Sequence, residues 1–231
     1  MSRILGNAAP RRKVLAGMLV GSAALALPAC QTIPGFSLTE AIRRLLTVSS
    51  ENAFARLTAP DGFWDEQVAK VGLSNLLGTR GDVLSDILTS ALFKDRLENA
   101  FADIAIEGSY RAAPLVADAV RVIGIENAEA LVRGGPRAAT AFLQGEMGGQ
   151  LIEAMVPELG DAIRIASDPL VAELINGLTG TDVGGIAQRL AGNVNDAIWD
   201  EIGFEEEAIR RDPRSTNDPL LMGVFGAGAV L

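Results

Sequence analysis

Apolar residues recur with the period of a helix over most of the chain. The first stripe follows the sequence Ser-Leu-Thr-Glu at residues 37–40, which is typical of a capping box at a helix N-terminus. Its members are separated by three or four positions or their sums and are Leu38, Ile42, Leu45, Ala53 and Leu57. This pattern predicts a helix from residue 38 to about residue 58.

The next stretch has a weaker pattern. Residues 59–62 have the sequence Ala-Pro-Asp-Gly, which favours a turn. The periodicity from Phe63 to Gly81 is poor, so the prediction there is irregular structure with one short helix. From Val83 onward the pattern is helical almost to the end.

Proline and glycine mark the expected helix boundaries in the second half. The Gly-Gly-Pro sequence at residues 134–136 is expected to end one helix and to start the next. A break is also expected at Pro157, and the Asp-Pro pairs at 168–169 and 218–219 each place a capping carboxylate before a helix. Strand signals are nearly absent, so the prediction is one all-α domain over residues 37–231, with about seven to nine helices.

The first 29 residues have a different pattern, in which a basic stretch precedes an apolar run from Val14 to Leu27. That run is shorter than the roughly 20 residues that span a bilayer as a helix. The order of basic, apolar and small residues is that of a secretory signal. We therefore expect residues 1–29 to be removed on export by the general or the twin-arginine route.

The predicted cleavage site resembles the lipobox of bacterial lipoproteins, with Leu27, Ala29 and Cys30 at its defining positions. Cys30 is the only cysteine, so it has no internal disulfide partner, and acylation supplies a reason for it. Lipid on Cys30 would anchor the chain to a membrane through residues 30–36 as a tether. Gln31 is not the Asp of inner-membrane retention, which favours the outer membrane facing the periplasm.

Charge excludes one class of partner. Without the four basic residues of the signal, 16 Lys and Arg stand against 29 Asp and Glu, a net charge of −13. Because nucleic-acid binding needs a basic face, nucleic acid is not an expected partner.

Few residues suited to catalysis are present. The chain has no histidine, and Cys30 is assigned to lipid, which removes the usual general base, nucleophilic pairs and soft metal ligands. Gly145, Gly148 and Gly149 lack the dinucleotide spacing and a preceding strand, so they predict a helix interruption or a close helix contact. No cofactor or metal site is predicted, and the two tryptophans are expected in the core.

Carboxylates are the remaining candidates for acid–base chemistry. Glu205, Glu206 and Glu207 form the densest cluster, followed by Arg210 and Arg211 at i,i+4 spacing. The preferred interpretation is a solvated charged face; the alternative is a carboxylate-dependent hydrolase in which burial raises the pKa of one glutamate.

Two segments carry a family resemblance. Their shared positions are Gly134, Gly135, Ala138, Ala139 and Thr140 in the first, and Glu205, Glu206, Glu207, Ile209, Arg210, Pro213, Phe225 and Gly226 in the second. They resemble segments of an uncharacterised bacterial family of exported helical proteins, known as domain of unknown function 4197. Pro136 stands where that family usually has Asp. The resemblance implies an all-helical exported protein and no particular activity.

These observations favour a non-enzymatic envelope lipoprotein that presents an acidic helical surface to a protein partner. A carrier of an apolar ligand or lipid is the alternative, because the many Ala and Gly residues can leave a groove between helices. A continuous apolar pocket of at least about 300 Å³ within the helices from Val83 to Ile175 would put the carrier ahead of the hydrolase.

Overall fold

The structure is a computed structural model that describes residues 37–60, 62–77, 91–165 and 183–226, all within a compact unit that begins at Phe36. The described residues contain nine α-helices, one 3-10 helix and no strand, which confirms the predicted all-α class. The predicted signal, lipobox and tether lie outside these residues, as does the Asp-Pro pair at 168–169. The elements are α1 (Leu38–Leu57), α2 (Phe63–Val71), α3 (Leu73–Leu77), α5 (Ala91–Val122), α6 (Ala128–Val132), α7 (Ala138–Met147), α8 (Gln150–Ile165), α10 (Val183–Arg211), the 3-10 helix η1 (Pro213–Thr216) and α11 (Pro219–Phe225).

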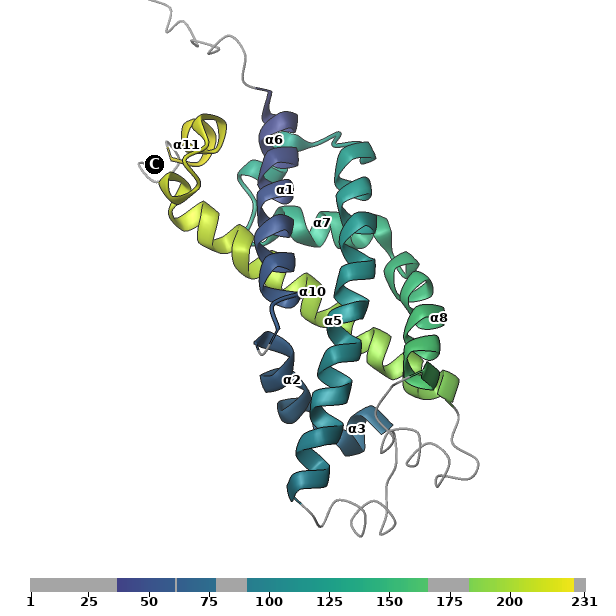
Figure 1. Ribbon diagram of the computed structural model, residues 1–231. Helices are drawn as coiled ribbons and strands as arrows, with labels where there is room; N and C mark the ends of the chain where they lie inside the picture. The colour runs from purple at the N-terminus through teal and green to yellow at the C-terminus, as the bar shows by residue number, and fades with distance from the viewer. Residues whose placement is uncertain (1–36, 61, 78–90, 166–182, 227–231) are drawn as a thin grey trace, which may run out of the picture. The chain divides into compact units, whose positions relative to one another are not determined.

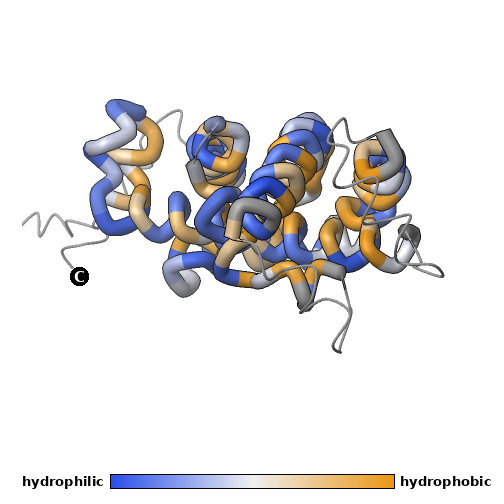
Figure 2. The backbone as a smooth tube through the Cα atoms, turned by 60° about the horizontal axis from the view of Figure 1, so that its bottom comes forward, coloured by the Kyte–Doolittle hydropathy of each residue, from blue (hydrophilic) through white to orange (hydrophobic). Residues whose placement is uncertain are grey.

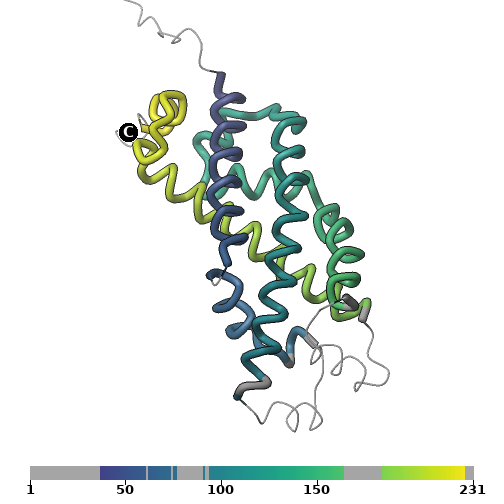
Figure 3. The backbone as a smooth tube through the Cα atoms, in the orientation of Figure 1, coloured from purple at the N-terminus to yellow at the C-terminus, as the bar shows by residue number. Residues whose placement is uncertain are grey.

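Three long helices organise this unit. Helices α1 and α5 lie side by side, α10 crosses both of them, and α8 packs against α5 and α10 (Figure 1). The chain then returns, so that α11 lies beside α1 although the two helices stand at opposite ends of the described sequence (Figure 3). Apolar residues recur on the sides of the helices that face their neighbours (Figure 2).

Helix α1 begins and ends close to where its pattern predicts. Ser37 caps it by accepting a hydrogen bond from the amide of Glu40 at 3.4 Å. Four of the five stripe residues are fully buried, and Leu38, in the first turn, is 38% exposed. The stripe is therefore the face that α1 buries against α5 and α10.

Both tryptophans lie in the core, as expected, and each indole N–H has a partner. Trp64 donates to the hydroxyl of Ser109 at 3.1 Å, which joins α2 to α5. Trp199 donates to the side-chain oxygen of Asn195 at 3.0 Å, one turn earlier on α10.

The prediction of irregular structure with one short helix after Phe63 is wrong for residues 63–77, where two helices, α2 and α3, are separated only by Gly72. Helix α2 has no side-chain cap, but Asp65 and Glu66 lie in its first turn, where negative charge stabilises the helix dipole. Trp64 and Val68 are buried one turn apart, and this short apolar face is what the packing against α5 uses.

The predicted break at Pro157 is also wrong, because α8 continues through it from Gln150 to Ile165. Proline removes one backbone hydrogen bond of a helix. Pro157 is on the exposed side of α8, where water can satisfy the freed carbonyl, while Met155 and Leu159 are buried. The Gly-Gly-Pro boundary is correct to within two residues, since α7 begins at Ala138.

The glycine interruption after Met147 is present as predicted. Helix α7 ends there, and Gly148 adopts a left-handed φ of 53° that favours glycine, before α8 begins at Gln150. This sharp turn places the end of α7 and the start of α8 beside each other.

The C-terminal segment docks on the domain as far as the structure describes it, to Gly226. Asp218 caps α11 and accepts a hydrogen bond from Arg44 of α1 at 2.7 Å. Burial raises the pKa of Asp218, but the hydrogen bonds from Arg44 and from the amides of Leu221 and Leu220 outweigh it and hold the pKa below its usual value. None of the helices in the described ranges is long and apolar enough to cross a membrane.

Candidate functional site

The buried carboxylate of Glu206 connects the two family-like segments. Glu206 lies on α10 and is fully buried. Its Oε1 accepts the amide of Ala139 at 3.0 Å, and its Oε2 accepts the amide of Thr140 at 2.7 Å and the Thr140 hydroxyl at 2.6 Å. The first amides of a helix have no partner within it. Because Arg137 at the N-cap of α7 provides no side-chain hydrogen bond, Glu206 performs the capping from another helix.

Arg210 is the charge partner of Glu206. Its guanidinium lies 2.7 Å from Oε1, and its side chain is only 10% exposed. The same guanidinium donates to the carbonyls of Leu131 and Val132 at the end of α6, at 2.9 and 3.0 Å. It also lies 4.8 Å from the ring centroid of Phe225 on α11. Glu206 and Arg210 therefore hold together the ends of α6 and α7, the long helix α10 and α11.

The solvated face expected for Glu205, Glu206 and Glu207 is wrong at Glu206. The pattern itself contained the signal, since Glu206 falls on the buried stripe of α10 between Ile202 and Ile209, at spacings of four and three. Glu207 is on the outer side of α10 and pairs with Arg211 at 2.7 Å.

The motif glycines and the motif proline lie at helix boundaries. Gly134 and Gly135 lie between α6 and α7, and a Cβ on Gly134 would lie 2.5 Å from that of Ala138. Pro213 is buried at the start of η1, and Gly226 follows α11. Leu27, Ala29 and Cys30 lie outside the described residues.

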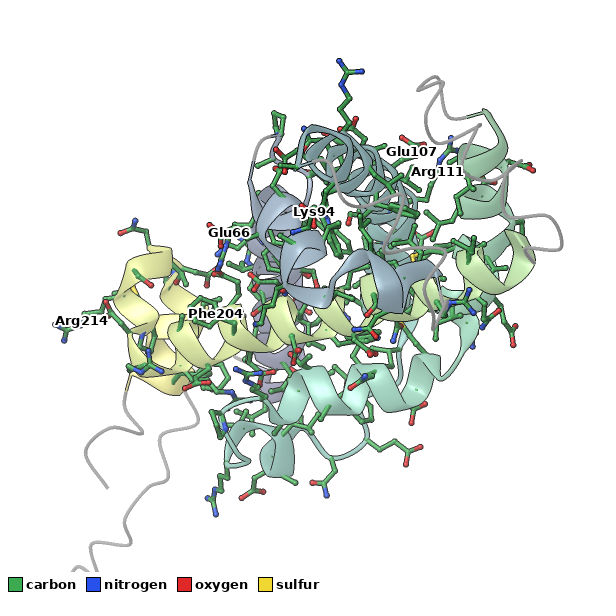
Figure 4. The ribbon with its side chains drawn as sticks, turned by 90° about the horizontal axis from the view of Figure 1, so that it is seen from below. Glu66, Lys94, Glu107, Arg111, Phe204 and Arg214 are labelled. Atoms are coloured by element: carbon green, nitrogen blue, oxygen red, sulfur yellow. The ribbon has the colours of Figure 1, made fainter. Side chains whose placement is uncertain are left out.

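A second charged cluster lies between α1 and α10. Arg56 contacts Glu201 at 3.1 Å and Glu205 at 3.2 Å, and its guanidinium lies 5.1 Å from the ring centroid of Phe204. Phe204 is 47% exposed and projects from α10 (Figure 4). Burial raises the pKa of Glu201, and the positive charge of Arg56 opposes that rise.

These arrangements do not resemble an acid–base site. Both oxygens of Glu206 are occupied by donors from the protein, so neither is directed at a substrate. Glu205 is bound by Arg56 and Asn52, and Glu207 by Arg211. Among the described residues, no group of three or more acidic side chains is placed to hold a metal ion. Both charged clusters are better explained as contacts that stabilise the fold than as sites of acid–base catalysis.

A concave feature lies elsewhere, at the corner where α5 and α7 end and α8 begins. It is an open groove of about 560 Å³. Its lining comprises Leu115, Asp118, Ala119, Val122, Ile123 and Gly124 from α5 and the residues after it, Glu146 and Met147 from α7, and Gln150, Leu151 and Ala154 from α8. Sequence reasoning did not single out these residues individually, because a groove depends on how three helix ends meet.

The groove has one wall with exposed apolar side chains, on the α5 side. Val122 is 81% exposed and Leu115 is 37% exposed, whereas the floor residue Leu151 is fully buried. Exposed apolar side chains that are gathered in a groove and rimmed by polar residues make it a candidate binding surface.

Comparison with known proteins gave one match. No curated protein and no solved structure matches the chain. The sequence profile of the family described as "Protein of unknown function (DUF4197)" matches residues 33–226, which include all the helices described above and both motif segments. The chain therefore belongs to the DUF4197 family.

Proposed function

We propose that this chain is an exported, lipid-anchored protein of the cell envelope, and that its helical domain acts by binding a partner protein rather than by catalysis. The observation that carries the binding function is the groove, whose α5 wall exposes the apolar side chains of Leu115 and Val122. Anchoring is supported by the lipobox-like Leu27, Ala29 and Cys30. A tether after Cys30 would hold the domain near the membrane and raise its effective concentration for other envelope proteins.

Anchoring through Cys30 predicts a complete change of location in a Cys30→Ala chain. Labelled palmitate should appear on the wild type and be absent from the variant, because the variant lacks the thiol that accepts lipid. After export, the variant should also leave the membrane fraction. A Ser37→Ala chain serves as the matched control and should keep both its label and its location. Palmitate retained by the Cys30→Ala chain would refute the lipoprotein assignment.

A carrier of an apolar ligand is the second candidate, and the volume of the groove favours it over a hydrolase. At about 560 Å³ the groove exceeds the roughly 300 Å³ expected of a ligand pocket. However, ligand pockets usually enclose most of the ligand, and this groove is open on one side. Its shape therefore suits a docked protein segment better than a carried lipid.

Photo-crosslinking in intact cells distinguishes the binding of a partner protein from the carriage of an apolar ligand. A photoreactive residue at position 122 should form one discrete protein adduct, and the same residue at position 222 should not, since exposed Met222 lies on α11 away from the groove. The adduct should disappear when Leu115→Lys is added, because the lysine places a charge in the apolar wall. An adduct of lipid mass at position 122 would favour the carrier. Equal labelling at both positions would remove the groove as the binding surface.

A further inference from the structure

The residues that line the groove on α5 are arranged along the helix axis. Leu115, Ala119 and Val122 are separated by four and three positions, so they form one stripe about 10 Å long. On the α8 side, Ala154 is exposed, and Leu151 is fully buried in the floor of the groove. An apolar stripe with this helical spacing, beside a groove, can receive the apolar face of a partner helix, whose anchor residues repeat at the same spacing.

Backbone hydrogen bonding supports the same occupant. A bound strand pairs its peptide groups with the edge of a sheet, and the described part of the chain has no strand. A helix satisfies its own peptide groups and can bury its apolar face in the groove without such an edge. A bound segment in the helical conformation therefore loses the least free energy from desolvation of its peptide groups in this groove.

The charged residues at the rim are acidic. Asp118 and Glu146 both line the groove, from α5 and α7. Asp118 forms an ion pair with Arg121, whereas Glu146 forms no ion pair with any residue in the described ranges. The C-termini of α5 and α7 and the N-terminus of α8 meet here, so the helix ends contribute partial charges of both signs. The formal charge of the side chains that line the groove is negative.

From this geometry we propose that the groove binds an amphipathic helix of a partner protein whose apolar stripe is flanked by lysine or arginine. The assignment rests on the binding function proposed above and specifies the partner. The apolar stripe of the partner would lie against Leu115, Ala119 and Val122, and its basic flank would face Glu146 and Asp118. An anionic membrane surface is disfavoured because the same carboxylates repel it.

Designed peptides test this proposal directly. Three helical peptides of about 18 residues would share a leucine stripe and carry lysine, glutamine or glutamate on the other face. Their affinities would be measured by fluorescence anisotropy against the full lipidated chain in neutral phosphatidylcholine nanodiscs. A Val122→Lys chain in the same discs tests the groove, since Val122 is exposed and its replacement leaves the core intact. A Met222→Lys chain is the matched control for adding a surface lysine.

We expect the lysine peptide to bind most tightly and the glutamate peptide least. Val122→Lys should weaken the lysine peptide about tenfold or more, and Met222→Lys should not. Combining Asp118→Asn with Glu146→Gln should weaken it about three- to tenfold, in line with the usual strength of exposed ion pairs. Glu66→Gln on α2, outside the groove, should have no effect.

Other results separate the two proposals. If Val122→Lys weakens all three peptides equally and the acid-to-amide changes have no effect, the basic partner is excluded while the binding groove stands. If no peptide responds to Val122→Lys, both proposals fail. If the domain instead docks through Val122 on discs containing phosphatidylglycerol without peptide, its occupant is a membrane and the partner helix is excluded.

Discussion

Replacing Glu206 with alanine is expected to destabilise the protein by about 3–5 kcal/mol, the range for removing one partner of a buried ion pair. Arg210 would keep its charge at 10% exposure without a counter-ion, and the amides of Ala139 and Thr140 would lose their acceptors. For a domain of this size, the melting temperature should fall by about 6–20 °C. Urea unfolding followed by the fluorescence of the buried Trp64 and Trp199 measures the change.

Glu207 provides the control for this measurement. It is the next residue on the same helix. Its partners Arg211 and Arg137 are exposed and Glu207 itself is one-third exposed, so Glu207→Ala should cost less than about 1 kcal/mol. The loss of stability in Glu206→Gln should lie between those of Glu206→Ala and Glu207→Ala, because the amide can accept some of the hydrogen bonds but carries no charge. Similar losses for Glu206→Ala and Glu207→Ala would show that the buried pair does not hold the helix ends together.

The sequence was sufficient for the helical class because its signals are local. The cap at Ser37, the stripe of α1 and the cap at Asp218 each depend on residues within one or two turns, and the structure has all three. Pro157 misled the prediction because the cost of a proline depends on whether water reaches the freed carbonyl. That exposure is set by the face that α8 buries, which is decided by tertiary packing.

The contact between the two family-like segments could not be predicted from local patterns. Thr140 and Glu206 are 66 residues apart, and nothing local to either indicates that one caps the helix of the other. An acidic residue within an apolar stripe was the available signal, and the neighbouring Glu205 and Glu207 concealed it by suggesting a charged surface. The groove was still less predictable, since its walls come from α5, α7 and α8.

The glycine pair before α7 offers a second large effect with a neighbouring control. In Gly134→Ala, the new methyl group would lie 2.5 Å from Cβ of Ala138 and 3.0 Å from the carbonyl oxygen of Ala130. Neither atom lies at the end of a flexible side chain, so the link between α6 and α7 must move. We expect a loss of about 1–3 kcal/mol in the free energy of unfolding, as for other overpacked sites.

Gly135→Ala should behave differently, because no atom lies within 4 Å of the added methyl group. Its effect should stay within about 0.5 kcal/mol, with a small gain if the alanine restricts the unfolded chain. A double-mutant cycle then tests the cause. Ala138→Gly removes the methyl group that Gly134→Ala would meet, so the double variant should lose less stability than the two single variants together. Additive losses would show that the carbonyl oxygen of Ala130, and not the methyl group of Ala138, is what excludes a side chain at position 134.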